Sequence, residues 1–132
     1  MVSRFTTAPD LGELEDIARY AFHRIPIELR CHAEGVVIHV KDFPDAETEH
    51  DLRLESPFDL LGLYRGVSLD QKSVFEVPAD IDMIFLYRRP ILDYWLGSGE
   101  DITHIVRHVL IHEIGHHFGL SDEDMEKIEG SP

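Results

Sequence analysis

The segment His112-Glu113-Ile114-Gly115-His116 combines two imidazoles and one carboxylate within five residues. On an α-helix the two histidines stand one turn apart, so both rings can bind one metal ion from the same face. Glu113 lies about 100° round the helix from His112, where its carboxylate can take a proton from metal-bound water. Histidine nitrogens and carboxylate oxygens are common ligands of zinc. Bound zinc lowers the pKa of its water from about 16 to near 7, which suits hydrolysis. The pattern therefore predicts one zinc ion and hydrolysis, with Glu113 as the base.

A third metal ligand is expected shortly after His116, and Gly119 explains how the chain can supply it. Glycine adopts left-handed backbone conformations at little steric cost, so it can end the helix and turn the chain back toward the ion. Asp122 then occupies the position at which the longer motif H-E-x-x-H-x-x-G-x-x-H carries its third histidine. We expect Asp122 to be the third ligand, with Asp124 and Glu123 as rivals.

Further histidines surround the motif and are not expected to bind the ion. His104 and His108 extend the series of histidines at four-residue spacing. His108 and His116 would start about 12 Å apart along a helix axis, too far for both to join His112 on one ion with bonds near 2 Å. His117 lies about 100° from His116 and is expected to point away from the ion in a structural role.

Helical periodicity indicates how the motif is positioned. Asp101 is a suitable cap for a long helix that begins at residue 102 and ends near Gly119. Asp10 can cap an N-terminal helix over about residues 11–23, and its apolar face is expected to pack on a sheet. Pro90 is expected to open a short helix to about residue 96, and Ser121 to cap a final turn over residues 122–128.

Strand patterns are weaker and more scattered than the helical ones. Alternating apolar residues predict a strand over residues 36–40, with a short connection or turn over residues 25–29 before it. A short strand is expected within residues 60–67, followed by a turn at residues 68–72, and a buried or edge strand over residues 81–87. The acidic, proline-containing segment 42–57 is expected to be a long irregular loop with one helical turn near residues 47–52.

Composition limits the class of protein and its partners. The length of 132 residues predicts one domain over residues 1–132, and a formal charge of −14 disfavours nucleic acid and anionic membranes. Cys31 is the only cysteine, which excludes an intramolecular disulfide and fits a reducing cytoplasm. No signal peptide or membrane-spanning stretch is recognised. We therefore expect a cytoplasmic protein; its oligomeric state is left open.

These residues give the chain a resemblance to the small bacterial zincin-like metallopeptidases, also described as MMP-like minimal zincins. The resemblance runs from Ile25-Pro26 through residues 61–66 and 86–91 to residues 112–125, where it is most specific. The form H-E-x-x-H-x-x-G-x-x-D is also similar to that of snapalysin-type peptidases. Metzincins carry a methionine turn well beyond the third ligand, whereas Met125 follows Asp122 by three residues, so Met125 is not equated with that turn.

The resemblance implies an α+β fold, with a small twisted mixed β-sheet backed by helices and the motif on a long helix. It also implies zinc bound by His112, His116 and Asp122, with Glu113 as the base. Hydrolysis of a peptide or protein substrate is the leading hypothesis, and residues 81–87 are expected to help position that substrate. The alternatives are a non-catalytic zinc-binding interaction module and a zinc-dependent endoribonuclease, against which the charge of −14 counts.

Overall fold

The structure, a computed structural model, describes residues 7–66 and 82–130. The turn expected at residues 68–72 lies outside the described residues. Short 3-10 helices stand at Cys31–Ala33 and Pro57–Asp59. The α-helices and strands follow one another as α1 Leu11–His23, α2 Ile27–Arg30, β1 Val37–Lys41, α3 Ala46–Asp51, β2 Gly62–Arg65, β3 Met83–Tyr87, α4 Arg88–Ser98, α5 Ile102–His117 and α6 Asp122–Glu129. The fold is α+β, as the sequence predicts, whereas the single domain over residues 1–132 stays a prediction.

The three strands form one mixed sheet in the order β1-β3-β2. β1 and β3 run parallel, with Val37 opposite Met83, and β2 and β3 run antiparallel, with Gly62 opposite Leu86. β3 is therefore the central strand, and its backbone groups are shared with neighbours on both sides. It offers no free edge to an extended peptide, so residues 81–87 contain the buried strand rather than an edge strand, the two alternatives that the sequence allows, and their help in positioning the substrate stays a prediction. The edges of this sheet are β1 and β2.

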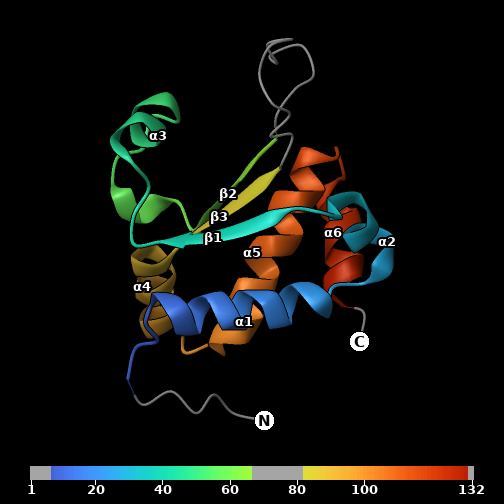
Figure 1. Cartoon of the computed structure of the whole chain (residues 1–132), viewed down its shortest axis with the longest axis horizontal. Helices are drawn as coiled ribbons and strands as arrows, with labels where there is room; N and C mark the ends of the chain where they lie inside the picture. Colours follow the sequence, from blue (N-terminus) through green and yellow to red (C-terminus); the bar gives the residue numbers. More distant parts are fainter. Residues whose placement is uncertain (1–6, 67–81, 131–132) are drawn as a thin grey trace.

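The hydrophobic core lies between the sheet and the two long helices. Ile84 and Leu86 alternate along β3 toward this side, and both are fully buried. α1 packs on β1 and on α5, and α5 also packs on β2; Figure 1 shows both helices on the same side of the sheet, with α3 beyond its other side. On that other side, Phe85 has the cations of Lys41 and Arg65 at 5.1 Å and 5.9 Å from its ring centre.

The predicted helix starts are confirmed by the hydrogen bonds of their capping residues. Asp10 accepts from the backbone N–H of Glu13 and forms a capping box at the start of α1. Asp101 accepts from the first-turn N–H groups of α5, and Ser121 accepts from the backbone N–H of Asp124 in α6. Helix α6 ends one residue beyond the predicted segment, at Glu129.

Two helical segments add detail to the expected ones. Residues 27–30 form the single helical turn α2, where a short connection or turn is expected, with Pro26 at its N-cap position. Helix α4 begins at Arg88, two residues before Pro90. Proline is tolerated there, because the first-turn N–H groups of a helix have no intrahelical acceptor.

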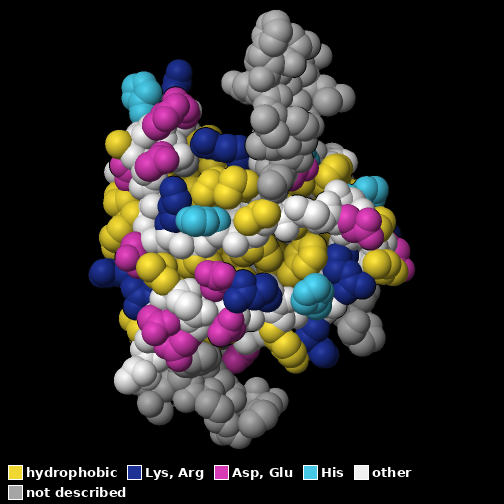
Figure 2. All heavy atoms as spheres, in the orientation of Figure 1, with side chains coloured by type: hydrophobic (Ala, Val, Ile, Leu, Met, Phe, Trp, Pro, Cys, Tyr) yellow, Lys and Arg dark blue, Asp and Glu magenta, His cyan; other side chains and the backbone are white. Residues whose placement is uncertain are grey.

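Two further features of the structure concern the charged surface and the hydropathy of the helices. Figure 2 shows acidic side chains spread over this face with basic ones among them, rather than gathered in one patch. Within residues 7–66 and 82–130, no helix combines the length and the hydropathy that a membrane crossing requires.

Candidate metal centre

The chain reverses direction directly after the motif helix, as Gly119 predicts. α5 ends at His117, and Gly119 has a φ of 77°, in the left-handed region. The Gly119 N–H donates to the carbonyl of His116 at 3.2 Å, and the Leu120 N–H donates to that of Gly115 at 2.8 Å. This pair of bonds is the Schellman motif, which satisfies carbonyls left open at the end of a helix. The turn directs the following helix back along α5.

Helix α6 then packs closely against α5 (Figure 1). A Cβ atom on Gly115 would lie 2.4 Å from the sulfur of Met125, so any larger residue at this position would force the Met125 side chain to move. Met125 is fully buried at the contact. The antiparallel arrangement brings the first residue of α6, Asp122, beside His116 and the last, Glu129, beside the earlier histidines of α5. One short helix therefore presents carboxylates at two levels of the histidine row.

The predicted ligands are brought together in part. Asp122 Oδ1 lies 3.6 Å from His116 Nε2, and the rings of His112 and His116 have centres 5.7 Å apart. Two donor atoms on one tetrahedral zinc ion, each about 2.1 Å from it, are about 3.4 Å apart, so the Asp122 and His116 pair fits such an ion. His112 instead directs Nε2 toward Glu129 Oε2, at 3.3 Å. The nitrogen and oxygen donors of this set suit zinc.

A residue that the sequence reasoning missed, Glu129, joins two histidines of α5. The ligand atoms of His108, His112 and Glu129 all lie within 4.8 Å of one another, and Glu129 Oε1 contacts His108 Nδ1 directly. The sequence predicts no ligand role for His108, because of its distance from His116 along the helix. The sequence held one usable signal: Glu129 follows Asp122 by seven residues, two helical turns, so both carboxylates share one face of α6.

The predicted base, Glu113, is half-buried and held by the backbone of β2. Its Oε1 accepts a hydrogen bond of 3.1 Å from the Tyr64 N–H. Burial raises the pKa of the Glu113 carboxyl above its usual value, while the Tyr64 N–H and the nearby His116 and His112 lower it by a smaller amount. Glu113 is therefore fixed in position next to the motif histidines and directly beside a sheet edge.

Tyr64 and His117 form the packing that joins β2 to the end of α5. Their rings are stacked with centres 4.0 Å apart, which is the structural role expected for His117. The Tyr64 hydroxyl donates to Asp82 Oδ2 at 2.7 Å. Burial, and then this hydrogen bond, raise the pKa of Tyr64, so its hydroxyl stays protonated as a donor. These contacts hold the strand that carries the Glu113 hydrogen bond.

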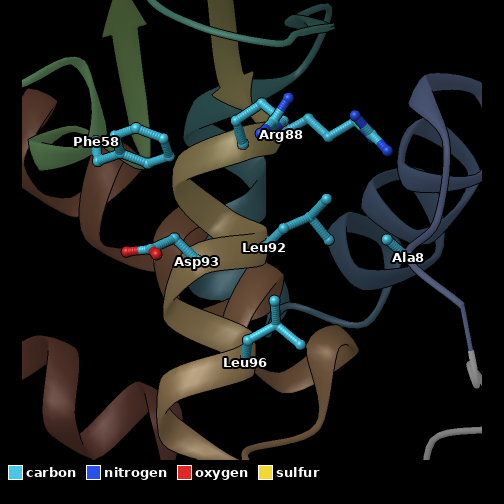
Figure 3. Close-up of a pocket in the computed structure, with 7 residues that line it drawn as sticks. Ala8, Phe58, Arg88, Leu92, Asp93 and Leu96 are labelled. Atoms are coloured by element: carbon cyan, nitrogen blue, oxygen red, sulfur yellow. The ribbon is translucent and has the colours of Figure 1, made fainter.

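Two surface hollows lie near the fold's helices, and they differ in their relation to the motif. One is lined by Leu61 and Val109 on its apolar side and by His104 and His108 of α5. The other lies along α4, where Leu92 and Leu96 face it and Arg88 extends across it toward the N-terminal segment (Figure 3). No motif residue lines the second hollow, whereas the first borders the histidine row.

Comparison with known families identifies the class of protein to which this fold belongs. The sequence profile of the zincin-like metallopeptidase family matches residues 33–131. The chain belongs to the zincin-like metallopeptidase family. The match covers β1 and all later elements, including the motif helix and α6. None of the curated proteins matches the chain. Zinc is the metal that this family implies.

Proposed function

We propose that the protein is a zinc-dependent metallopeptidase in which His112, His116 and Asp122 hold the ion and Glu113 is the general base. Family membership supports the class, and the 3.6 Å separation of His116 Nε2 and Asp122 Oδ1 supports this pair of ligands. Bound zinc would polarise the peptide carbonyl and make water acidic enough to be deprotonated near neutral pH. The protein itself supplies the base, the contacts that hold the base in position, and the strand β2, along which a peptide could pair.

The hydrogen bond between the Tyr64 N–H and Glu113 carries this proposal. The carbonyl of Leu61 accepts from the Tyr87 N–H at 2.9 Å, so Leu61 faces β3. Because backbone direction alternates along a strand, Gly62 and Tyr64 face the opposite way, toward the side of β2 that pairs with no other strand among the described residues. The Tyr64 N–H indeed leaves the sheet to meet Glu113. A peptide that extends the sheet along β2 would therefore pass beside the base.

The reaction then uses Glu113 twice. Its Oε1 is held by Tyr64, which leaves Oε2 to accept a proton from the attacking water. The water oxygen bonds to the carbonyl carbon, the C–N bond breaks, and the proton on Glu113 passes to the departing nitrogen. The hollow lined by Leu61 and Val109 stands next to the same edge and can take an apolar substrate side chain.

Replacement of Glu113 by glutamine tests the mechanism. We expect Glu113→Gln to bind one equivalent of zinc and to lose about 10²- to 10⁴-fold in the rate of peptide cleavage, because the amide cannot accept the proton. Zinc content by metal analysis and cleavage of a broad peptide library are the measurements. Glu126→Gln, on the exposed face of α6, is the matched control and should cleave as the wild type does. Undiminished cleavage by Glu113→Gln would remove Glu113 from the mechanism.

A non-catalytic zinc-binding module is the second candidate, and the contact of Glu129 with His112 favours it. A carboxylate 3.3 Å from Nε2 of a proposed ligand competes for that nitrogen. Wild-type protein that holds zinc but cleaves nothing in the library would support this candidate. An endoribonuclease would require RNA binding against a charge of −14. We keep the cytoplasm as the proposed compartment, because the single cysteine suits reducing conditions.

A further inference from the structure

We propose that His108, His112 and Glu129 form a second divalent-cation site. This site shares His112 with the metallopeptidase site, and the sharing rests on the proposed function, whereas the cation site itself does not. A cation bound between His108 and Glu129 would take the nitrogen of His112 that hydrolysis needs. The expected consequence is inhibition by zinc in excess of one equivalent.

The geometry of the three side chains supports a common ion. Glu129 spans both histidines, with Oε1 against His108 Nδ1 and Oε2 3.3 Å from His112 Nε2. The two rings stand one helical turn apart on α5, with centres 4.1 Å apart and planes at 31°. All three ligand atoms lie within 4.8 Å of one another. Two imidazole nitrogens and a carboxylate oxygen are a donor set that zinc accepts, with a fourth position open.

Hydrogen bonds from α5 hold the end of α6 that carries Glu129, and one side of the cluster is open to solvent. Arg107 of α5 donates to the carbonyl of Glu129 at 3.2 Å and to that of Ile128 at 3.5 Å, which ties the last turn of α6 to α5. The side chains of Glu129 and His112 are 19% and 25% exposed, but that of His108 is 51% exposed. Two ligands are therefore positioned in advance, and the third provides the entry for an ion.

Sharing follows from the chemistry of the imidazole ring. The Nε2 atom of a neutral histidine has one lone pair, so it binds a single ion. In this structure His112 Nε2 lies 3.3 Å from Glu129 Oε2, whereas His116 Nε2 lies 3.6 Å from Asp122 Oδ1. Asp122 and Glu129 occupy the same face of α6, one carboxylate for each proposed site. Occupation of the second site would therefore leave the first with two ligands.

Zinc titration of a variant without the first site tests the second directly. We expect the double variant His116→Ala, Asp122→Asn, freed of metal by dialysis, to bind about one equivalent of zinc in isothermal titration calorimetry. Adding Glu129→Gln or His108→Ala should weaken this binding at least about tenfold, since even the loss of an outer hydrogen-bond partner has an effect of that size. Adding His104→Ala instead should change nothing, because His104 continues the same row but lies outside the cluster. Circular dichroism checks that each variant is folded.

The inhibition experiment tests the sharing. Wild-type peptide hydrolysis should fall as free zinc exceeds one equivalent, and Glu129→Gln should abolish that fall. Persistent inhibition in Glu129→Gln would disprove the sharing. Absence of zinc binding by the folded double variant would disprove the second site and leave the cluster as an ion pair. If Glu129→Gln alone removed all zinc from the otherwise wild-type chain, there would be one site rather than two. The calorimetry requires no hydrolysis, so failure of the proposed peptidase activity would not be mistaken for failure of this site.

Discussion

Gly62 on β2 and Val109 on α5 are packed so closely that a Cβ atom on Gly62 would lie 2.5 Å from Val109 Cγ1. It would also lie 3.1 Å from the carbonyl oxygen of Phe85, so neither neighbour leaves room for a side chain. This contact sets the distance between the edge strand and the motif helix. The hydrogen bond from Tyr64 to Glu113 depends on that distance.

Gly62→Ala is therefore expected to destabilise the fold by about 1–3 kcal/mol, because α5 must move away from β2. The movement should also lower peptide hydrolysis more than zinc affinity, since it separates Glu113 from Tyr64. Urea denaturation, zinc titration and cleavage rates are the measurements. Gly97→Ala in α4 is the control, because no atom lies within 4 Å of the added Cβ and alanine favours the helix. Equal effects of the two substitutions would contradict the packing argument.

Gly119→Ala should cost about 1–2 kcal/mol of folding free energy, because alanine is strained at a φ of 77°. Gly35→Ala provides a matched comparison: Gly35 has a φ of 80°, and like Gly119 it has no neighbour within 4 Å of an added Cβ. The two variants should lose similar stability in urea. Only Gly119→Ala should also weaken zinc binding, because its turn delivers Asp122. A loss of zinc affinity in both would mean that general destabilisation is responsible.

The identity of the third ligand can be decided between Asp122 and Asp124. Asp122→Asn should weaken zinc binding at least about tenfold, given that Asp122 Oδ1 lies 3.6 Å from His116 Nε2. Asp124→Asn should leave the zinc affinity unchanged, because Asp124 is not a proposed ligand. The variant keeps the backbone N–H that donates to Ser121 Oγ, so the start of α6 stays capped. Calorimetric titration in the Glu129→Gln background isolates the first site. If Asp124→Asn weakened zinc binding and Asp122→Asn did not, Asp124 rather than Asp122 would be the third ligand.

Tyr64→Phe is expected to cost about 0.5–1.5 kcal/mol, because it removes the 2.7 Å hydrogen bond to Asp82 while keeping the stack on His117. Tyr64→Leu should cost about 0.5–1.5 kcal/mol more, the contribution of an aromatic pair. Thermal and urea unfolding measure both. Tyr20→Phe, at a position 56% exposed, should leave stability unchanged. Equal stability of the Phe and Leu variants would show that the stack contributes nothing.

Zinc should stabilise the native state against unfolding. A ligand at about 100 times its dissociation constant adds about 2.7 kcal/mol to the free energy of unfolding. Wild type and Glu113→Gln should both gain this amount when metal is restored after chelation. The double variant His116→Ala, Asp122→Asn should gain only what the second site contributes, which Glu129→Gln then removes. A gain that survives in the triple variant would point to binding elsewhere on the chain.

The starts of α1, α5 and α6 were predictable from local sequence, because their signals lie within a few residues. Asp10, Asp101 and Ser121 accept the first-turn N–H groups that each helix leaves open, and Gly119 has the backbone conformation that its residue type favours. The position of Glu113 one residue from His112 likewise follows from helix geometry alone.

The sheet and the reach of Glu129 were not predictable in the same way. Strand order depends on pairings between distant segments, so the run of residues at 81–87 could not be assigned to the centre of the sheet. The contact of Glu129 with His108 spans 21 residues and requires the Gly119 turn, the Gly115 contact and the length of α6 together. The sequence indicates each of these features separately, but it does not show that together they bring Glu129 next to His108.

The reversal at Gly119 also orders events during synthesis. A nascent chain that has emerged only as far as this glycine already contains both motif histidines and the proposed base, but neither Asp122 nor Glu129. With the proposed ligands, such a chain has no complete zinc site, because Asp122 arrives only with the helix that Met125 anchors. Under the proposed function, proteolytic activity would thus be acquired only once α6 has been synthesised and has packed against α5.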